Sequence, residues 1–371
     1  MRIRKIMQAL EEWAPPKLAE DWDNVGLLVG DPETEVTGVL TALDVTKENI
    51  CYAKEHGINL IVAHHPILFK PLKQLVAGDP VADLVRLLVQ NDIACYAAHT
   101  NLDIATAGVN DLLAEQIGLV DVKGLVPVHS EPFYKVAVFT PQTHADAVRA
   151  AMGDHGAGAL GDYSHCTFST QGQGRFLPLA GAQPFLGNPG QMETVEEERV
   201  EAIVSAHDLN TVIRAMLDAH PYEEAAYDVY PLERPRETSY LGRIGRFPKA
   251  MSLGDALKKI QTALEIPVLR YAGQRATIER VALCSGAGME FADAAVQKGA
   301  DLYLTADVKY HEAQRAAAQR IVVVDGHHYH TEIKIADRLA DYLAQMFATD
   351  GVRLNIVADP VRADIFSFWG N

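Results

Sequence analysis

Three clusters of histidine and acidic side chains stand out in the sequence, and each one directly follows a short apolar run. The clusters are His64-His65, residues 99–103 and residues 325–332. The apolar runs before them, at residues 58–62, 93–98 and 321–324, are typical of buried strands. In open α/β sheets, ligands bind beyond the carboxyl ends of the strands. We therefore expect the clusters to meet at one metal site, although a pair of hydrogen-bonded core histidines is the simpler interpretation of His64 and His65 alone.

Five side chains in these clusters are the candidate metal ligands, and together they supply three imidazoles and two carboxylates. They are His64, His65, Asp103, His328 and Glu332. Such a mixture of nitrogen and oxygen donors suits zinc, manganese, iron(II), cobalt or nickel better than magnesium or calcium. The set is too large for one tetrahedral ion with an open position, so it favours two divalent ions about 3.5–4 Å apart. Because such a pair lowers the pKa of bound water, the pattern predicts a metal-dependent hydrolase that uses metal-bound hydroxide.

Other side chains are candidates to support these ligands, because a metal-bound histidine needs a partner for its second ring nitrogen. Three histidines are candidates for a supporting or catalytic role: His99, His311 and His330. Three carboxylates are candidates to hold a ligand histidine: Asp44, Asp301 and Asp307. A surface or helix-capping role is an equally good interpretation of each. Asp23 and Asn24 are more typical of a turn, with a place in the site as the alternative.

The histidine ligand in the third cluster is either His327 or His328. Glu332 lies four residues after His328, so these two side chains share a face of a helix, whereas His327 is rotated away from it. Thr331 is a suitable residue to cap the last helix. If the helix starts only there, both histidines lie in a loop and the geometric argument loses its force. The spacing favours His328, and His327 is the rival.

The elements that carry the first two clusters alternate between strand and helix. We expect strands at residues 36–45, 58–62 and 93–98, and helices at residues 46–56, 79–90 and 109–117. Thr46 is the expected cap of the first of these helices. The alternation predicts a parallel or mixed sheet covered by helices. The pattern resumes near residue 278 and includes Gly286-Ala-Gly288, which is typical of a tight strand-to-helix turn or, alternatively, of a backbone nest for a substrate anion.

The pattern between these two halves is different. Residues 131–234 show the order strand-helix-strand-strand-helix-strand, which is the ferredoxin-like signature. A charged, proline-containing linker at residues 233–237 closes this segment. We therefore predict an α/β domain in two segments, residues 1–130 and 235–371, split by an inserted α+β domain at residues 131–234.

Length, charge and cysteine content indicate the number of domains, the kinds of partner and the location of the protein. A length of 371 residues predicts more than one domain, and a net charge of -16 argues against a nucleic-acid partner. The four cysteines are scattered without a Cys-x-x-Cys pair, which predicts reduced, buried thiols and a cytoplasmic location. Residues 3–13 have the spacing of an amphipathic helix rather than of a signal peptide, and no apolar run is long enough to cross a membrane.

Several short motifs resemble, in order along the chain, those of one known family. They are Asp23-Asn-Val-Gly26, His64-His65-Pro66, His99-Thr-Asn-Leu-Asp103, Thr305-Ala-Asp-Val-Lys-Tyr-His311 and His328-Tyr-His-Thr-Glu332. At these positions, residues 1–128 and 238–371 resemble the NIF-three-like dinuclear metal centre proteins, also called GTP cyclohydrolase I type 2 homologs. The resemblance implies a dinuclear site at the five candidate ligands and a toroidal homohexamer whose sites face an inner cavity. One departure is Gly326-His327-His328, because the family has glycine directly before the histidine ligand.

The inserted segment resembles the PII/CutA-like domain of longer family members, at Gly161-Asp-Tyr-Ser-His-Cys166 and His220-Pro-Tyr-Glu-Glu224. The resemblance implies a ferredoxin-like unit that trimerises. The resemblance of the two outer segments, in turn, implies a cyclohydrolase that acts on a purine nucleotide, with only Lys309 and Arg243 as candidates to contact its phosphates. A phosphoester or amide hydrolase would use the same two ions on another small-molecule substrate. The alternative is a non-enzymatic metal-handling or regulatory protein whose inserted domain senses a ligand or binds a partner.

Overall fold

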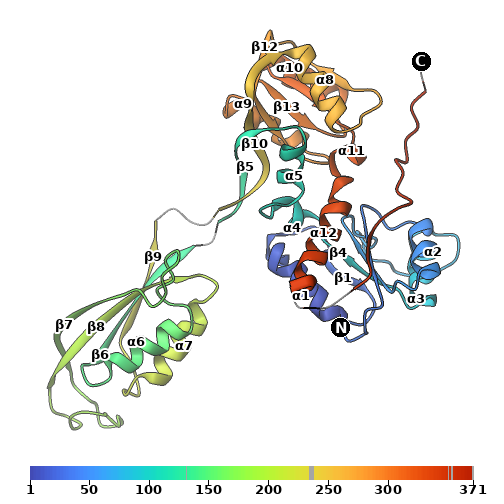
Figure 1. Ribbon diagram of the computed structural model, residues 1–371. Coiled ribbons are helices and arrows are strands. Elements are labelled where there is room, and N and C mark those ends of the chain that lie inside the picture. Colours follow the sequence, from blue (N-terminus) through green and yellow to red (C-terminus); the bar gives the residue numbers. More distant parts are fainter. Residues whose placement is uncertain (131, 234–237, 350, 352–353, 370–371) are drawn as a thin grey trace. The chain divides into compact units, whose positions relative to one another are not determined.

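The computed structural model describes residues 1–371 except 131, 234–237, 350, 352–353 and 370–371 (Figure 1). The chain forms two compact units, of which the first comprises Met1–His129 with Ser239–Asn371 and the second Ser130–Thr238. Residues 131 and 234, which are the predicted ends of the insert, lie outside the described residues, as does most of the predicted linker at 233–237. Strands and helices together give a mixed α/β fold.

The first sheet of the first unit has the strand order β1-β4-β3-β2-β15. Its strands are β1 (Gly26–Val29), β2 (Val39–Ala42), β3 (Leu60–Ala63), β4 (Ala94–Ala97) and β15 (Ile356–Ala358). The last four run parallel to one another, and β1 is antiparallel to β4. Because β3 and β4 are parallel neighbours, the polar residues that follow them come to the same edge of the sheet.

Helices cover both faces of this sheet, and strand residues alternate between the two cores. The helices are α1 (Ile3–Trp13), α2 (Lys47–Glu55), α3 (Pro80–Gln90) and α12 (Lys334–Thr349). In β3, Leu60 and Val62 pack with α1 and α12, whereas Ile61 packs with α2 and α3. Burial on both faces explains why the strands read as continuous apolar runs. The predicted cap of α2 is confirmed, because Thr46 and Asn49 form a reciprocal capping box.

The second sheet of this unit has six strands in the order β11-β14-β13-β12-β10-β5. They are β5 (Val120–Ser130), β10 (Thr238–Ser252), β11 (Arg270–Ala272), β12 (Thr277–Leu283), β13 (Leu302–Thr305) and β14 (Val322–Asp325). The strands β12, β13 and β14 are parallel, while β10 and β11 run antiparallel to their partners β12 and β14. The neighbours β5 and β10 flank the second unit in the sequence, so the chain leaves and re-enters the first unit at adjacent strands.

Further helices connect the strands of the first unit. They are η1 (Pro16–Leu18), α4 (Thr100–Ile104), α5 (Val109–Gln116), α8 (Leu253–Ala263), η2 (Met289–Phe291), α9 (Ala292–Gln297), α10 (Tyr310–Ala318) and α11 (His328–Glu332). Two of them follow a strand that ends in a polar cluster: α4 follows β4, and α11 follows β14. The third cluster therefore belongs to a different sheet from the first two.

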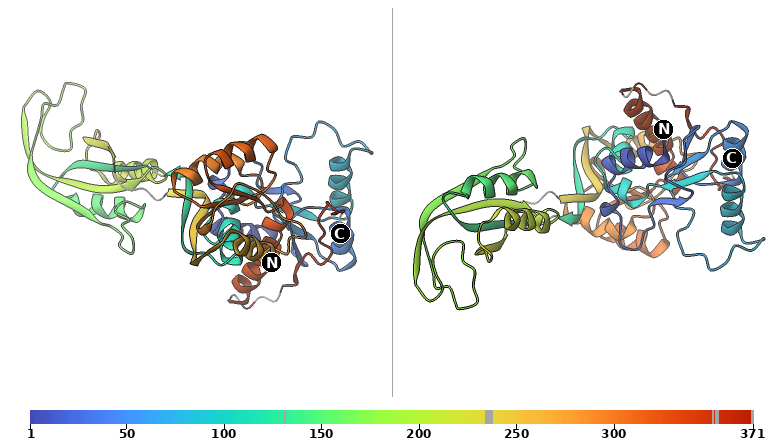
Figure 2. Two further views of the ribbon diagram at one scale, coloured as in Figure 1. Left: turned by 90° about the horizontal axis from the view of Figure 1, so that it is seen from above. Right: turned by 90° about the horizontal axis from the view of Figure 1, so that it is seen from below.

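The second unit is an antiparallel sheet with two helices that lie together on one face (Figure 1, Figure 2). Its elements are β6 (Phe133–Pro141), α6 (Ala145–Asp154), β7 (Thr167–Phe176), β8 (Glu193–Ser205), α7 (Leu209–Ala219) and β9 (Tyr227–Leu232). The strand order in the sheet is β7-β8-β6-β9, which with this chain order is the ferredoxin-like arrangement. Val136 and Val200 of the strands pack against Met152 and Met216 of the helices in a separate core.

The cysteines are only partly as expected. Cys95 and Cys284 are buried, but Cys51 is exposed and Cys166 is half-buried, so the expectation of four buried thiols is wrong for these two. Cys51 faces solvent because its neighbour Ile50 occupies the core-facing side of α2. All four are free thiols. Within the part of the chain that the structure describes, no helix has the length and apolar character needed to span a bilayer.

We predict that the first unit folds without the second. The buried side chains of its four cores all come from its own two segments. A short Gly/Ser linker in place of residues 130–238 would join the adjacent strands β5 and β10. The shortened protein should therefore stay soluble and unfold in one cooperative thermal transition, measured by circular dichroism. Aggregation or a gradual, non-cooperative melt would show that the first unit needs the second for its core.

Candidate metal centre

The three polar clusters come together in the first unit, where strands of both sheets end. Six side chains contribute: His64 and His65 directly after β3, His99 and Asp103 at α4, and His328 and Glu332 on α11. All five candidate ligands are therefore in one place, and His99 joins them.

Glu332 makes the closest contacts in this cluster. Its Oε2 lies 3.0 Å from His65 Nε2 and 3.1 Å from His328 Nε2. His64 Nε2 lies 3.7 Å from Asp103 Oδ1. Three groups offer ligand atoms that all lie within 4.8 Å of one another: His64-Asp103-Glu332, His65-His328-Glu332 and His64-His65-His99. Each group could hold a metal ion, and Glu332 belongs to two of them.

The four histidines share one orientation, in which Nδ1 is held by the protein. The Nδ1 partners, each at 2.8 Å, are Ala98 O for His64, Asp44 Oδ1 for His65, Asp23 Oδ1 for His99 and Asp307 Oδ2 for His328. A metal-bound histidine is normally fixed in this way, with Nε2 left for the ion. Asp44 and Asp307 thus hold two of the candidate ligand histidines, which agrees with the first of the two roles considered for them. Asp301 does not, because its carboxylate accepts the backbone N–H groups of residues 279 and 280 instead.

His64 is the strongest sign that the cluster is suited to a cation. The residue is fully buried, and its Nε2 has no hydrogen-bond partner among the described residues. Burial lowers the pKa of His64 to about 3, so the imidazole is neutral and its Nε2 lone pair is available. A buried polar atom without a partner is costly, and a metal ion would remove that cost. The donors present therefore fit a divalent transition metal.

The carboxylates and the other imidazoles of the cluster shift one another's pKa values. Burial, reinforced by the Glu332 carboxylate, raises the pKa of Asp103 to about 7. Burial alone would also raise the pKa of Glu332, but hydrogen bonds from His328 and His65 hold that pKa well below its ordinary value. Conversely, burial alone would lower the pKa of His65 and of His328. Their carboxylate partners outweigh burial and raise the pKa of His65 to about 10 and that of His328 to about 9. The two imidazolium protons thus offset a buried carboxylate, as a divalent cation bound to the same atoms would.

The turn after β12 provides the space that Glu332 occupies. Gly286 has a φ of +57°, and a Cβ at this position would lie 2.4 Å from Glu332 Oε1 and 3.2 Å from His328 Nε2. Its N–H donates to Thr331 Oγ1, and the N–H of Gly288 donates to Thr305 Oγ1. Because these two N–H groups are already bonded, the contacts favour a tight packing turn over the alternative of an anion-binding nest.

The structure distinguishes His328 from His327. The helix α11 begins at His328, so this residue and Glu332 lie one turn apart on the same face. His327 has a positive φ of 56°, and its Nε2 bonds to Val268 O outside the cluster. The expectation that Thr331 caps the last helix is wrong, because Thr331 lies within α11 and the last helix, α12, begins only at Lys334. The Thr331 hydroxyl bonds back to the carbonyl oxygens of His327 and His328 instead.

The other two histidines considered for a catalytic role lie outside the cluster. His311 is exposed on α10, and its Nδ1 lies 3.5 Å from Gln314 Oε1. His330 bonds through Nδ1 to Leu264 O and lies 3.6 Å from Asp364 through Nε2. Neither belongs to a group of potential ligands among the described residues. A role for either one in the reaction stays a prediction that no contact with the cluster supports.

Sequence reasoning undervalued the segment around Asp23. The Asp23 carboxylate is held by His99 on one oxygen and by the backbone N–H and hydroxyl of Thr100 on the other, so it is part of the site and not only a turn former. Next to it, exposed Trp22 and Phe69 line a cavity of about 590 Å³, with their ring centroids 5.7 Å apart. The pairing of two aromatic residues so distant in the chain leaves no signal in one sequence.

The chain matches one protein family along almost its whole length. The family model described as Duf34/NIF3 (NGG1p interacting factor 3) matches residues 1–364, and the chain belongs to this family. A relative from Halalkalibacterium halodurans, named GTP cyclohydrolase 1 type 2 homolog, is 41% identical over 364 residues and 98% of each chain is covered. A Bacillus subtilis relative with the same name is 37% identical over 366 residues, again with 98% of each chain covered.

Solved structures agree with this assignment. A Bacillus cereus protein related to NIF3 has a TM-score of 0.83 at 40% identity, covering 100% of this chain and 99% of that one. A Staphylococcus aureus protein has a TM-score of 0.86 at 30% identity with the same coverage. The resemblance to the NIF-three-like proteins is therefore confirmed.

We predict that His328→Ala lowers the metal content of the purified protein sharply, whereas His327→Ala leaves it nearly unchanged. His328 Nε2 lies beside Glu332, but His327 Nε2 is bonded to a backbone carbonyl elsewhere. Elemental analysis after removal of free metal measures the difference, and circular dichroism checks that both variants are folded. Normal loading of His328→Ala together with loss of metal from His327→Ala would reverse the assignment.

Proposed function

We propose that this protein holds two divalent metal ions in the cluster and uses them to hydrolyse a small-molecule substrate. The observation that carries the proposal is that two groups of potential ligands share Glu332. One ion would be held by His64 and Asp103 and the other by His65 and His328, with Glu332 available to both. The donor set favours zinc, iron, manganese, cobalt or nickel. Two such ions, when bound, act as Lewis acids and make water a nucleophile near neutral pH.

The residues around the ligands prepare the site for this chemistry. Asp44 and Asp307 hold His65 and His328 by Nδ1, so that Nε2 of each faces Glu332. The pairing of imidazole with carboxylate raises the basicity of the ligand nitrogen and restricts the rotation of the ring. The complete burial of His64 keeps bulk water from one side of the cluster.

His99 is the residue we assign to proton transfer. Asp23 holds its Nδ1, which leaves Nε2 next to His64 and His65 as a proton acceptor or donor. The neighbouring Trp22 ring stands edge-on to His99, with centroids 6.2 Å apart. The cavity lined by Trp22 and Phe69 would hold an apolar or planar part of the substrate beside this histidine.

The name of the relatives suggests hydrolysis of a purine nucleotide, but one of the two candidate phosphate contacts is not available for it. Arg243 is buried and bonded to Asp111, so it ties β10 to α5 and is not free to hold a phosphate. Lys309 is largely exposed and lies 3.8 Å from Glu312. We therefore propose hydrolysis at an electron-poor carbon or a phosphoester of a small planar substrate, with a cyclohydrolase reaction as one member of that class.

We also propose the assembly and the character of the second unit that the family resemblance implies. The assembly is a toroidal homohexamer with the metal sites facing an inner cavity. The second unit is a PII/CutA-like domain, which its ferredoxin-like strand order supports. The mass of the intact protein in solution, measured by light scattering, tests the assembly.

The metal content tests the central part of the proposal. The purified protein should contain about two transition metal ions per chain, as a two-metal site requires. His64→Ala and Asp103→Ala should each lose at least one ion, because each removes a ligand from a group of three. His311→Ala is the matched control and should keep both, since this histidine is exposed on α10 away from the cluster. Full occupancy in both ligand variants would contradict the site.

The role of His99 gives a separate prediction. His99→Gln should keep its metal and lose about 100-fold or more in turnover, because a general acid or base contributes on the order of 10²–10⁴ in rate. The assay follows hydrolysis of a panel of model substrates, such as an aryl phosphodiester and an aryl amide, by metal-loaded protein. Unchanged turnover would remove His99 from the mechanism, and loss of metal would make it a ligand. A wild-type protein that binds two ions and turns over nothing on a broad panel would favour a metal-handling role.

A further inference from the structure

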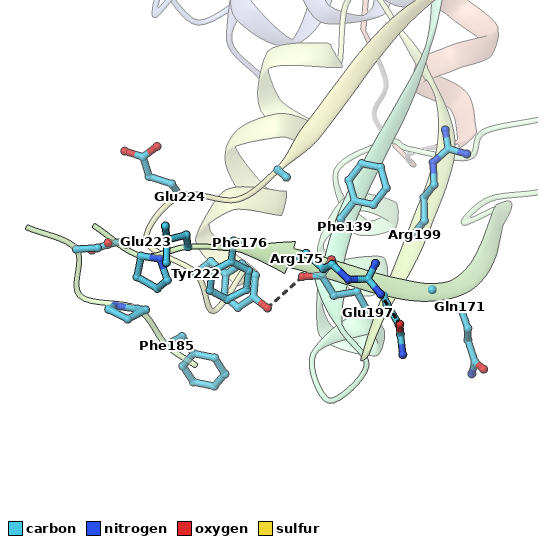
Figure 3. Close-up of a pocket in the computed structure, with 18 of the residues that line it drawn as sticks. Phe139, Gln171, Arg175, Phe176, Phe185, Glu197, Arg199, Tyr222, Glu223 and Glu224 are labelled. Atoms are coloured by element: carbon cyan, nitrogen blue, oxygen red, sulfur yellow. Dashed lines mark hydrogen bonds between the residues drawn. The ribbon is translucent and has the colours of Figure 1, made fainter. Parts of the chain in front are cut away.

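A second cavity lies entirely within the second unit and shares no residue with the metal centre. Its volume is about 680 Å³, within the range of pockets that hold small organic ligands. The β7–β8 hairpin, the loop after α7 and the end of β6 contribute the lining (Figure 3). The aromatic side chains of this lining are Phe139, Phe176, Phe185 and Tyr222.

Contacts between segments distant in the sequence shape this cavity. The ring of Tyr222 stands at a steep angle to that of Phe176, with centroids 5.8 Å apart, and lies 6.4 Å from that of Phe185. The loop between β7 and β8 turns back over the cavity, where the Gln183 N–H donates to Glu223 Oε1 at 3.0 Å. The cavity is therefore walled by aromatic rings from β7, from the hairpin loop and from the loop after α7.

A buried carboxylate, Glu197, lies in this otherwise mainly apolar cavity. The residue is only 8% exposed. Its Oε1 accepts the hydroxyl of Tyr222 at 3.1 Å, as Figure 3 shows, whereas Oε2 has no protein donor within the described part of the unit. The chain makes room for this oxygen, because a Cβ on Gly174 of the neighbouring strand β7 would lie 2.1 Å from it. Oε2 is not among the fully buried atoms that lack a partner, so a ligand in the cavity can reach it. A hydrogen-bond donor, preferably a positively charged one, is the best partner for a carboxylate in this mainly apolar setting.

The other charged groups of the lining favour a ligand without negative charge. Arg199 pairs through Nη2 with Glu201, while its Nε has no hydrogen-bond partner among the described residues. Arg175 is the other cation, and Glu223 and Glu224 add two further carboxylates at the exposed side. The cavity thus has no surplus of positive charge for a polyanion such as a triphosphate. A ligand that is positively charged or carries N–H donors would not be repelled by the carboxylates of the lining.

We propose that this cavity is a binding site for a small organic molecule with a flat ring and an amino or amidino group. The ring lies among Phe176, Phe185 and Tyr222, which supply apolar contact and favourable interaction with a positive charge. The N–H donors of the group bond to Glu197 Oε2. The second unit is then a ligand-binding module with its own specificity, independent of the chemistry at the metal centre.

Benzamidine is the probe for this site, because it is a flat ring with a planar, positively charged pair of N–H donors. Benzoate is its counterpart of nearly the same shape and opposite charge. Both are titrated into the intact, metal-loaded protein and followed by calorimetry and ligand-observed NMR. Benzamidine should bind saturably, and benzoate should bind at least about tenfold more weakly, as expected for a charge-assisted hydrogen bond to a buried carboxylate.

Glu197→Gln should weaken benzamidine binding at least about tenfold and abolish the preference over benzoate, because it keeps the shape of the side chain and removes the charge. The matched control is Glu196→Gln, an exposed carboxylate one position earlier on β8, which should leave both affinities unchanged. Gly174→Ala is a second test, since its Cβ would displace the Glu197 carboxylate, and it should also weaken binding. Circular dichroism and metal content confirm that the variants are folded. No saturable binding of benzamidine, equal binding of benzoate, or equal effects of Glu197→Gln and Glu196→Gln would overturn the proposal.

Discussion

The buried carboxylate of Glu332, held between the imidazoles of His65 and His328, is the interaction on which the rest of the first unit depends. A buried anion is tolerated only when positive charge and hydrogen bonds surround it. The end of β3 supplies one imidazole, and the first turn of α11 supplies the other together with the carboxylate itself. The turn after β12 must use glycine at position 286, because any Cβ there would occupy the place of the carboxylate.

This arrangement ties two sheets to one site. β3 and β4 belong to the first sheet and β14 to the second, so the cluster forms only when both sheets are in place. The second unit interrupts the chain between β5 and β10, which are neighbours in the second sheet and distant in sequence from the residues of the cluster. An insertion at this point adds a complete fold with its own core and its own cavity, while the cores of the first unit draw only on its own two segments.

Much of this could be predicted from the sequence, because apolar runs fully buried in parallel strands end abruptly at polar residues. The five candidate ligands follow from that pattern. It also offers Asp44, Asp301 and Asp307 as candidates to hold a histidine, and only the structure selects Asp44 and Asp307 among them. Details that depend on competition between local bonds could not be predicted. The Thr331 hydroxyl bonds back within α11 instead of capping the last helix, and Arg243 is buried beside Asp111. The cavity in the second unit arises from side chains that only the folded sheet brings together, so no local pattern marks it.

The most direct test of the account is the anomalous scattering of metal-loaded crystals, collected on both sides of the absorption edge of the bound metal. The account predicts two peaks in each chain, about 3.5–4 Å apart. One should lie within about 2.0–2.2 Å of a His64 nitrogen and the other at that distance from His328, with the Glu332 carboxylate between them. A single peak, or two peaks of which neither contacts Glu332, would contradict the claim that this buried carboxylate organises a dinuclear centre.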